Sequence, residues 1–170
     1  MKTLIKKTKL KDVLVIKPYK FKDLRGSFLE TYNMGDFNKK IKKIKFVQDD
    51  ISVSKKNVLR GIHGDNKTWK LVSCILGKIY LIVVNNNKKS KEYKKWISII
   101  LSEKNNKQIL IPPKFGNAYV ALSKKVIYSY KQSTYYDRKS QFTINWKDER
   151  YNFKWPIKKP ILSDRDKFNQ

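Results

Sequence analysis

Short β-type runs, each closed by a turn signal, follow one another along almost the whole chain. They are rich in β-branched and aromatic residues, which favour pleated strands over helices. The runs occupy residues 13–18, 26–31, 46–54, 58–62, 68–76, 78–84, 96–101, 108–112, 118–122, 126–130 and 142–146. Many short strands at this spacing predict an all-β sandwich or barrel. We expect a jelly-roll barrel with little helix (one short turn near residues 34–39) and solvated Lys-rich chain ends.

No repeat, long linker or break in composition divides the sequence, so we expect one domain over residues 1–170. No apolar run approaches the roughly 20 residues that span a bilayer. The first residues reach charge again too soon for a signal peptide. The single cysteine, Cys74, lies in an apolar run, and we read it as a buried thiol in a reducing compartment. These features predict a cytoplasmic protein without a membrane partner.

The formal net charge of +26 suggests nucleic-acid binding, but the kind of basic residue argues against it. Only five of the 40 basic residues are Arg, and the Lys residues are spread along the whole chain. Proteins that read nucleic acids use Arg for bidentate contacts and cluster their charge. We therefore expect no nucleic-acid partner. An Arg in such a Lys-rich chain can mark a site that needs a planar fork, and the candidates are Arg25, Arg60, Arg150 and Arg165.

His63 is the only histidine in the chain. A single imidazole cannot build the multi-histidine metal site that many jelly-roll barrels carry. If the protein does chemistry near neutral pH, His63 is the natural group to move protons. We expect acid–base chemistry by organic side chains, with no metal and no cofactor.

Other side chains would complete a set suited to proton abstraction beside a carbonyl. A carboxylate such as Asp166 can fix the tautomer of a histidine, and a Lys70 ammonium can neutralise an enolate oxygen. A phenol can deliver a proton from the other side, and an Arg pair can hold phosphates. Each group also has a plain structural reading, because Lys70 could be solvated and Asp166 could cap a turn. Tyr130 alternates with Tyr128, and we expect one of these two to face the core.

Five motifs occur in a fixed order between residues 12 and 166. They are Asp-x-Arg-Gly-x-Phe-x-Glu at 23–30, Leu-Arg-Gly-Ile-His at 59–63, Lys-Leu-Val at 70–72, Tyr-Lys at 130–131 and Leu-Ser-x-x-Asp at 162–166. In this order they resemble the nucleotide-sugar 3,5-epimerase family typified by dTDP-4-dehydrorhamnose 3,5-epimerase. The resemblance implies a metal-free cupin barrel, an isomerase that needs no cofactor, and a homodimer in which N-terminal strands cross over.

The same resemblance implies roles for individual residues. His63 matches the general base, Asp166 its orienting partner, Tyr130 the opposing general acid, and Lys70 the group that faces the C4 oxygen. The substrate-binding positions follow in the same way. Nucleotide and phosphate contacts fall on Arg25, Glu30, Gln48 and Arg60, and a position near the substrate falls on Arg165.

Three departures from the rhamnose-type pattern involve further candidate substrate-binding residues. Asn117 stands where those enzymes have a second histidine, and it can hydrogen-bond a sugar oxygen but cannot titrate. The usual Gln-x-Asn becomes Gln48-Asp49-Asp50, and His63 is followed by Gly64-Asp65. With these changes the chain resembles a branch of related epimerases that act on GDP-linked 4-keto-heptoses in bacterial capsule synthesis.

The main expectation is therefore epimerisation at C3, with or without C5, of GDP-4-keto-6-deoxyheptose, in capsule or surface polysaccharide synthesis. The first alternative is a dTDP-4-dehydrorhamnose-type 3,5-epimerase, and the second is a dTDP-sugar 3,4-ketoisomerase. A nucleotide-sugar-binding barrel without turnover and a basic RNA-binding module remain as alternatives from other classes. The RNA-binding module would leave His63, Lys70 and Tyr130 without a task.

Overall fold

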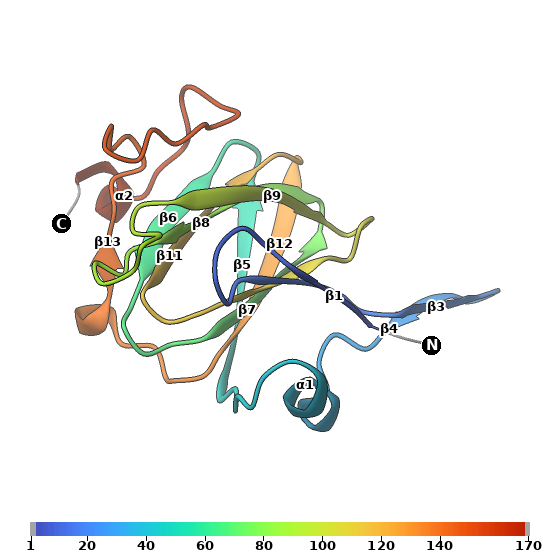
Figure 1. Cartoon of the computed structure of the whole chain (residues 1–170). Coiled ribbons are helices and arrows are strands. Elements are labelled where there is room, and N and C mark those ends of the chain that lie inside the picture. Colours follow the sequence, from blue (N-terminus) through green and yellow to red (C-terminus); the bar gives the residue numbers. More distant parts are fainter. Residues whose placement is uncertain (1–2, 169–170) are drawn as a thin grey trace.

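The computed structural model describes residues 3–168, and most of its strands lie in two facing antiparallel sheets (Figure 1). In this part of the chain, one sheet has six strands: β1 (Leu4–Lys7), β2 (Leu14–Lys17), β10 (Gln108–Ile111), β7 (Lys70–Leu76), β12 (Lys125–Gln132) and β5 (Gln48–Lys55). The other has five: β13 (Phe142–Thr143), β6 (Leu59–Gly64), β11 (Phe115–Ala121), β8 (Lys78–Asn85) and β9 (Trp96–Ser102). The expected jelly-roll architecture is confirmed.

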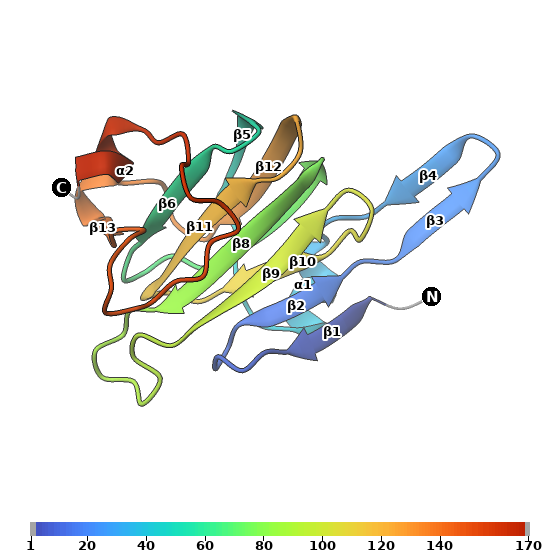
Figure 2. The same cartoon turned by 90° about the horizontal axis from the view of Figure 1, so that it is seen from above.

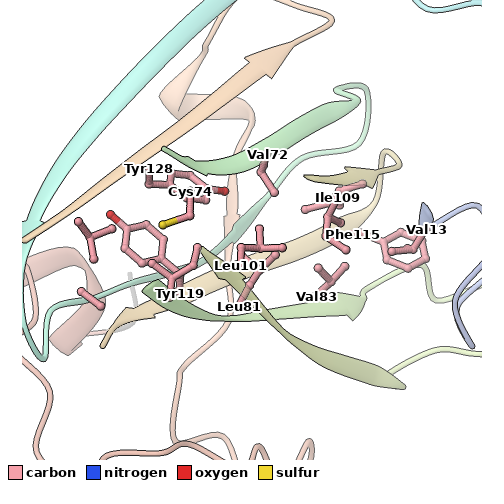
Figure 3. Close-up of a cluster of buried hydrophobic side chains, with 14 of the residues drawn as sticks. Val13, Val72, Cys74, Leu81, Val83, Leu101, Ile109, Phe115, Tyr119 and Tyr128 are labelled. Atoms are coloured by element: carbon pink, nitrogen blue, oxygen red, sulfur yellow. The ribbon is translucent and has the colours of Figure 1, made fainter. Parts of the chain in front are cut away.

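The main hydrophobic core fills the space between the two sheets (Figure 3). Alternate residues of β8, such as Leu81 and Val83, point into this core and meet side chains of β7 and β10. Val84, which points to the other face of β8, is also buried, because it packs there against the C-terminal part of the chain. Coverage on both faces explains why β8 reads as a continuous apolar run rather than an alternating one.

The C-terminal part of the chain packs back onto the five-stranded sheet and continues to β6. Trp146 is buried against Leu59, and the indole of Trp155 donates to the carbonyl of Trp146 at 2.7 Å. Further on, the Leu59 amide donates to the Ile161 carbonyl at 3.0 Å, and Val58 and Ile161 form a parallel bridge. This pairing places the short helix α2 (Asp164–Phe168) beside β6 (Figure 1).

A two-stranded hairpin, β3 (Lys20–Asp23) and β4 (Gly26–Leu29), projects away from the barrel (Figure 2). The helix α1 (Met34–Lys40) follows it and packs Phe37 against β2 and β10. The helix matches the short turn expected near residues 34–39. No helix in residues 3–168 has the length and apolarity needed to cross a membrane.

Three elements differ from the sequence-based expectation. β1 was expected to be a solvated tail, and its four residues are indeed exposed, but they pair with β2 through the backbone. A strand held only by backbone pairing leaves no hydrophobic alternation to detect. β3 lacks alternation for the same reason, since its side chains are largely exposed. The five-residue α2 is too short for a helical period to show in the sequence.

Candidate active site

A cavity of about 290 Å³ opens between the two sheets at the end covered by α2. Residues of β5, β6, β7, β11 and β12 line it, together with the C-terminal part of the chain. The cavity brings together seven of the residues expected from the sequence: Arg60, His63, Lys70, Asn117, Tyr130, Arg165 and Asp166.

His63 and Asp166 form a close pair on one wall of this cavity. Nε2 of His63 lies 2.8 Å from Oδ1 of Asp166, and the Asp166 side chain is only 3% exposed. This contact is a close approach rather than a well-aligned hydrogen bond, since neither of these two buried atoms has a hydrogen-bonding partner within residues 3–168. The other carboxylate oxygen, Oδ2, accepts a hydrogen bond from the Ser163 hydroxyl at 2.9 Å. The contact engages Nε2 of the imidazole and leaves Nδ1 as the nitrogen that can take a proton from a ligand.

The pKa of Asp166 lies below its usual value. Burial alone would raise this pKa, but the contacts with His63 and Ser163 stabilise the carboxylate and outweigh burial. Asp166 is therefore ionised at neutral pH. An ionised carboxylate beside an imidazole stabilises the imidazolium that forms when the histidine takes up a proton.

Lys70 and Tyr130 belong to the six-stranded sheet, whereas His63 belongs to the five-stranded sheet. Lys70 is 9% exposed, and burial lowers the pKa of its ammonium against the opposing pull of Asp65. Burial raises the pKa of Tyr130 to about 12, and the negative charge of Asp50 adds to this. Tyr130 is thus a protonated phenol across a wide pH range.

Tyr128 is the one of these two tyrosines that belongs to the buried core, as expected, and both Tyr128 and Tyr130 also face the cavity. Residues two apart on a strand share a face, and both phenols line the cavity together with Gln132. The ring of Tyr128 stacks on Tyr119 of β11 with 4.5 Å between centroids, and it lies 5.5 Å from the Tyr130 ring. Figure 3 shows Tyr119 and Tyr128 side by side at one end of the core.

The two cavity arginines are each tied to a neighbouring strand. Nε of Arg60 donates to the Ser54 hydroxyl at 3.0 Å and its Nη2 donates to the Val53 carbonyl at 3.3 Å, although the residue as a whole is exposed. Nη2 of Arg165 donates to the Thr143 hydroxyl at 3.0 Å. These contacts leave other guanidinium N–H groups free to bind an anionic ligand.

Asn117 lies directly opposite His63 in the β11–β6 pairing. Its Nδ2 donates to the Tyr128 hydroxyl at 3.2 Å, whereas its Oδ1 is buried without a partner in the described part of the chain. The asparagine therefore links the wall that carries His63 to the phenols of the other sheet.

Two expected substrate-binding residues lie away from the cavity of their own chain. Arg25 sits at the turn of the β3–β4 hairpin, where Nη2 binds the Asp23 carboxylate at 2.6 Å with 88% of the Arg25 side chain exposed. Glu30 lines a small hollow between α1 and strands β1 and β2. Sequence motifs identified both residues, but Arg25 lies on the projecting hairpin (Figure 2), Glu30 follows directly after it, and neither lines the cavity that holds His63.

Three other expected residues lie next to the cavity without lining it: Gln48, Asp50 and Asp65. The Asp50 carboxylate accepts hydrogen bonds from Nε2 of Gln48 at 2.9 Å and from Nε2 of Gln132 at 2.9 Å. The buried Asp65 carboxylate accepts the backbone N–H of Thr68 at 2.7 Å and thereby closes the turn before β7. In this structure the carboxylates of Asp50 and Asp65 are engaged by the protein itself.

Sequence reasoning missed seven residues that line the cavity. Period-two alternation on β11 and β12, extended from Asn117 and Tyr130, would have found those with buried aromatic or amide groups. The others come from neighbouring strands and loops with no recognisable signal. The seven are Ser52, Tyr119, Tyr128, Gln132, Tyr136, Gln141 and Ser163.

The described residues 3–168 contain no group of three or more His, Cys, Asp or Glu side chains arranged to hold a metal ion. What the cavity does hold is a histidine–carboxylate pair on one wall and an ammonium and a phenol on the other. This arrangement can remove a proton from one face of a carbon beside a ketone and return a proton to the opposite face.

Known proteins share both the sequence and the fold. The profile of the dTDP-4-dehydrorhamnose 3,5-epimerase family matches residues 7–170. The dTDP-4-dehydrorhamnose 3,5-epimerase of Salmonella typhimurium is 41% identical over 165 residues, which is 94% of this chain and 90% of that protein. The enzyme of the same name from Methanothermobacter thermautotrophicus is 34% identical and covers 95% of this chain and 90% of its own length.

Solved structures agree with the sequence comparison. The dTDP-4-dehydrorhamnose 3,5-epimerase of Bacillus anthracis, with TDP and PPi bound, superimposes with a TM-score of 0.95 at 31% identity over 99% of both chains. The dTDP-6-deoxy-D-glucose-3,5-epimerase of Legionella pneumophila, in complex with dTDP-4-keto-L-rhamnose, gives a TM-score of 0.94 at 30% identity over 98% of this chain and 90% of that one.

The barrel and its cavity, taken with these relatives, define a cupin-fold isomerase of the carbohydrate-epimerase class. The chain belongs to the dTDP-4-dehydrorhamnose 3,5-epimerase family. The expected family and enzyme class are thereby confirmed. The relatives described above are named for dTDP-linked sugars and give no support to the GDP-heptose branch.

Proposed function

We propose that this protein inverts C3, or C3 and C5, of a dTDP-linked 4-keto-6-deoxy sugar. The observation that carries the proposal is the His63–Asp166 pair, which shares a cavity with Lys70 and Tyr130 of the opposite sheet. The similar proteins support a dTDP-linked substrate, because they are named for dTDP-linked sugars. The proposal replaces the GDP-linked heptose expected from the sequence with the first alternative.

The mechanism begins with the acidity that the C4 ketone gives to the proton on C3. His63 removes this proton and becomes an imidazolium beside the ionised Asp166. The electron pair moves onto the C4 oxygen, where the Lys70 ammonium stabilises the enolate. The Tyr130 phenol then donates its proton to the other face of C3, which inverts the carbon and restores the ketone.

Two contributions make this route fast enough for an enzyme. A positioned general base typically accelerates proton transfer by roughly 10²–10⁴-fold. One donor to a developing oxyanion contributes about 2.7–4 kcal/mol. Exchange with water returns the phenolate of Tyr130 and the imidazolium of His63 to their starting forms. The same groups would act on C5 in a second round.

One incubation tests the reaction and the nucleotide together. The protein is supplied with dTDP-linked and GDP-linked 4-keto-6-deoxy sugars in heavy water, and NMR locates the deuterium and the inverted carbons. We expect deuterium at C3 of the dTDP-linked sugar, with the ketone still at C4. A ketone moved to C3 would indicate the ketoisomerase, and binding without deuterium would indicate a non-catalytic barrel. Faster exchange in the GDP-linked sugar would restore the GDP-heptose reading.

We further propose that the active form is a homodimer in which the β3–β4 hairpin reaches the cavity of the partner subunit. The hairpin exposes Phe21, Leu24 and Phe28, an apolar set that a second copy could cover. Its Arg25 would then meet the nucleotide bound by the other subunit. Chains carrying Arg25→Ala and chains carrying His63→Asn should regain activity when mixed, because one cavity of the mixed dimer has both residues. No gain on mixing, or a monomer by light scattering, would refute this arrangement.

The single domain over residues 1–170, the cytoplasmic location and the part in capsule or surface polysaccharide synthesis stay predictions. The absence of a requirement for a metal or a cofactor also stays a prediction. Activity measured after dialysis against a chelator tests the metal requirement directly.

A further inference from the structure

The hydroxyl of Tyr128 has a donor hydrogen that the mechanism above does not use. A phenol offers one hydrogen and accepts through its oxygen. Nδ2 of Asn117 already donates to this oxygen at 3.2 Å, so the hydrogen of Tyr128 must point elsewhere. Among the described residues, none accepts a hydrogen bond from it. Buried hydrogen-bond donors in folded proteins rarely lack a partner, so a bound ligand is the natural acceptor for this hydrogen.

The neighbouring phenol of Tyr119 shows the contrast. It is as deeply buried as Tyr128 and stacks on its ring, but its hydroxyl meets the Ser52 and Ser54 hydroxyls at 2.8 and 2.9 Å. The protein therefore satisfies one of two adjacent phenols and leaves the hydrogen of the other free. Burial, together with Tyr119 and Tyr130, raises the pKa of Tyr128 well above its usual value, so the hydroxyl keeps this hydrogen.

Tyr128 lies at the inner end of the cavity. It is 4% exposed, whereas Arg60 and Tyr136 at the rim are exposed. A sugar nucleotide whose diphosphate lies near Arg60 would present the ring carbons farthest from C1 to the inner end. The farthest is C4, which carries the ketone, and C3, the carbon to be inverted, lies next to it. Tyr128 also lies between the wall that carries His63 and the wall that carries Tyr130. Its hydroxyl is hydrogen-bonded to Asn117, which pairs with His63, and its ring packs beside that of Tyr130.

We propose that Tyr128 is a substrate-binding residue whose hydroxyl donates a hydrogen bond to an oxygen on the C3–C4 edge of the sugar. Asn117 holds the phenol in this orientation by occupying its acceptor side. The inference rests on the proposed function and adds a second donor beside Lys70 at the keto edge. In this arrangement Asn117 positions the Tyr128 hydroxyl, a role that does not require a side chain that gains or loses a proton.

The test compares Tyr128→Phe with the wild-type protein, using a dTDP-linked 4-keto-6-deoxy sugar for turnover and dTDP alone for binding. The variant loses only the hydroxyl. We expect kcat/KM to fall roughly 5- to 100-fold, because the sugar oxygen and the Asn117 amide both lose a partner. The Kd for dTDP should stay within about twofold, since the nucleotide does not reach the inner end. A variant with kcat/KM within about twofold of wild type would overturn the inference, as would an equal loss in dTDP binding.

A second variant keeps the phenol and its packing. Asn117→Asp offers only acceptors when ionised, so the Tyr128 hydroxyl turns to the new carboxylate and away from the sugar. We expect the same pattern of lost turnover and retained dTDP binding, and unchanged turnover would overturn the inference even if Tyr128→Phe fails to fold. If the wild-type protein puts no deuterium into the sugar, the proposed function fails instead, so the two failures are distinguishable.

Discussion

Replacing Asp166 with Asn tests whether the carboxylate supports the imidazolium of His63. The two side chains meet at 2.8 Å, and with 3% of the Asp166 side chain exposed, water screens the contact little. A hydrogen bond to a charged group contributes about 1.5–3 kcal/mol. Because the charge on His63 develops only as the proton moves, this energy is lost from the transition state. We therefore expect Asp166→Asn to lower kcat/KM roughly 10- to 150-fold.

The assay is the initial rate of deuterium incorporation at C3 of a dTDP-linked 4-keto-6-deoxy sugar, followed by NMR. Asp164→Asn is the matched control, because it makes the same change on α2 at a carboxylate that is 88% exposed and pairs with the exposed Lys167. The control should leave the rate unchanged. If Asp166→Asn stays within about threefold of wild type while folded, the pair does not act as a unit in catalysis and the reasoning is wrong.

Three further predictions follow from the site. Tyr130→Phe should still exchange the C3 proton with solvent but should not invert the carbon, and an equal fall in both measurements by NMR would contradict the assigned acid. Burial lowers the pKa of Lys70 below 10.5, whereas the pKa of Tyr130 is about 12, so kcat/KM should decline on the alkaline side as Lys70 loses its charge. Lys70→Arg should move this decline to higher pH, and an unmoved decline would point to another group. Because the pKa of Asp166 is lower in the folded protein than its ordinary 3.8, the ionised carboxylate stabilises the fold above pH 3.8, and this stability is lost as pH falls through the pKa of the folded state. Below pH 3.8 the wild-type protein should therefore lose more free energy of unfolding than Asp166→Asn. Equal losses in urea titrations of the two proteins would contradict this.

The strand pattern was predictable because each run combines β-branched residues with a following turn signal. The elements that were missed lack such local information. β1 is held by backbone pairing with β2, and α2 is fixed by the bridge between Val58 and Ile161. Both depend on contacts made only after the rest of the chain has folded.

The site was predictable only in part, and the reason differs between residues. Motif order identified His63 and Asp166, but no spacing rule could show that β6 and α2 would place them 2.8 Å apart. Period-two alternation on β12 would have placed Tyr128 in the cavity beside Tyr130. Arg25 is the opposite case, since its motif is clear while the hairpin carries it away from its own cavity.

The most direct measurement of the central claim is proton exchange in heavy water by His63→Asn. The variant keeps a polar side chain of similar size at this position but has no group that can take up the C3 proton. With folding and dTDP binding retained, deuterium incorporation at C3 should fall by at least roughly 10²-fold. Incorporation at the wild-type rate would show that another group removes the proton, and the account of this site would be wrong.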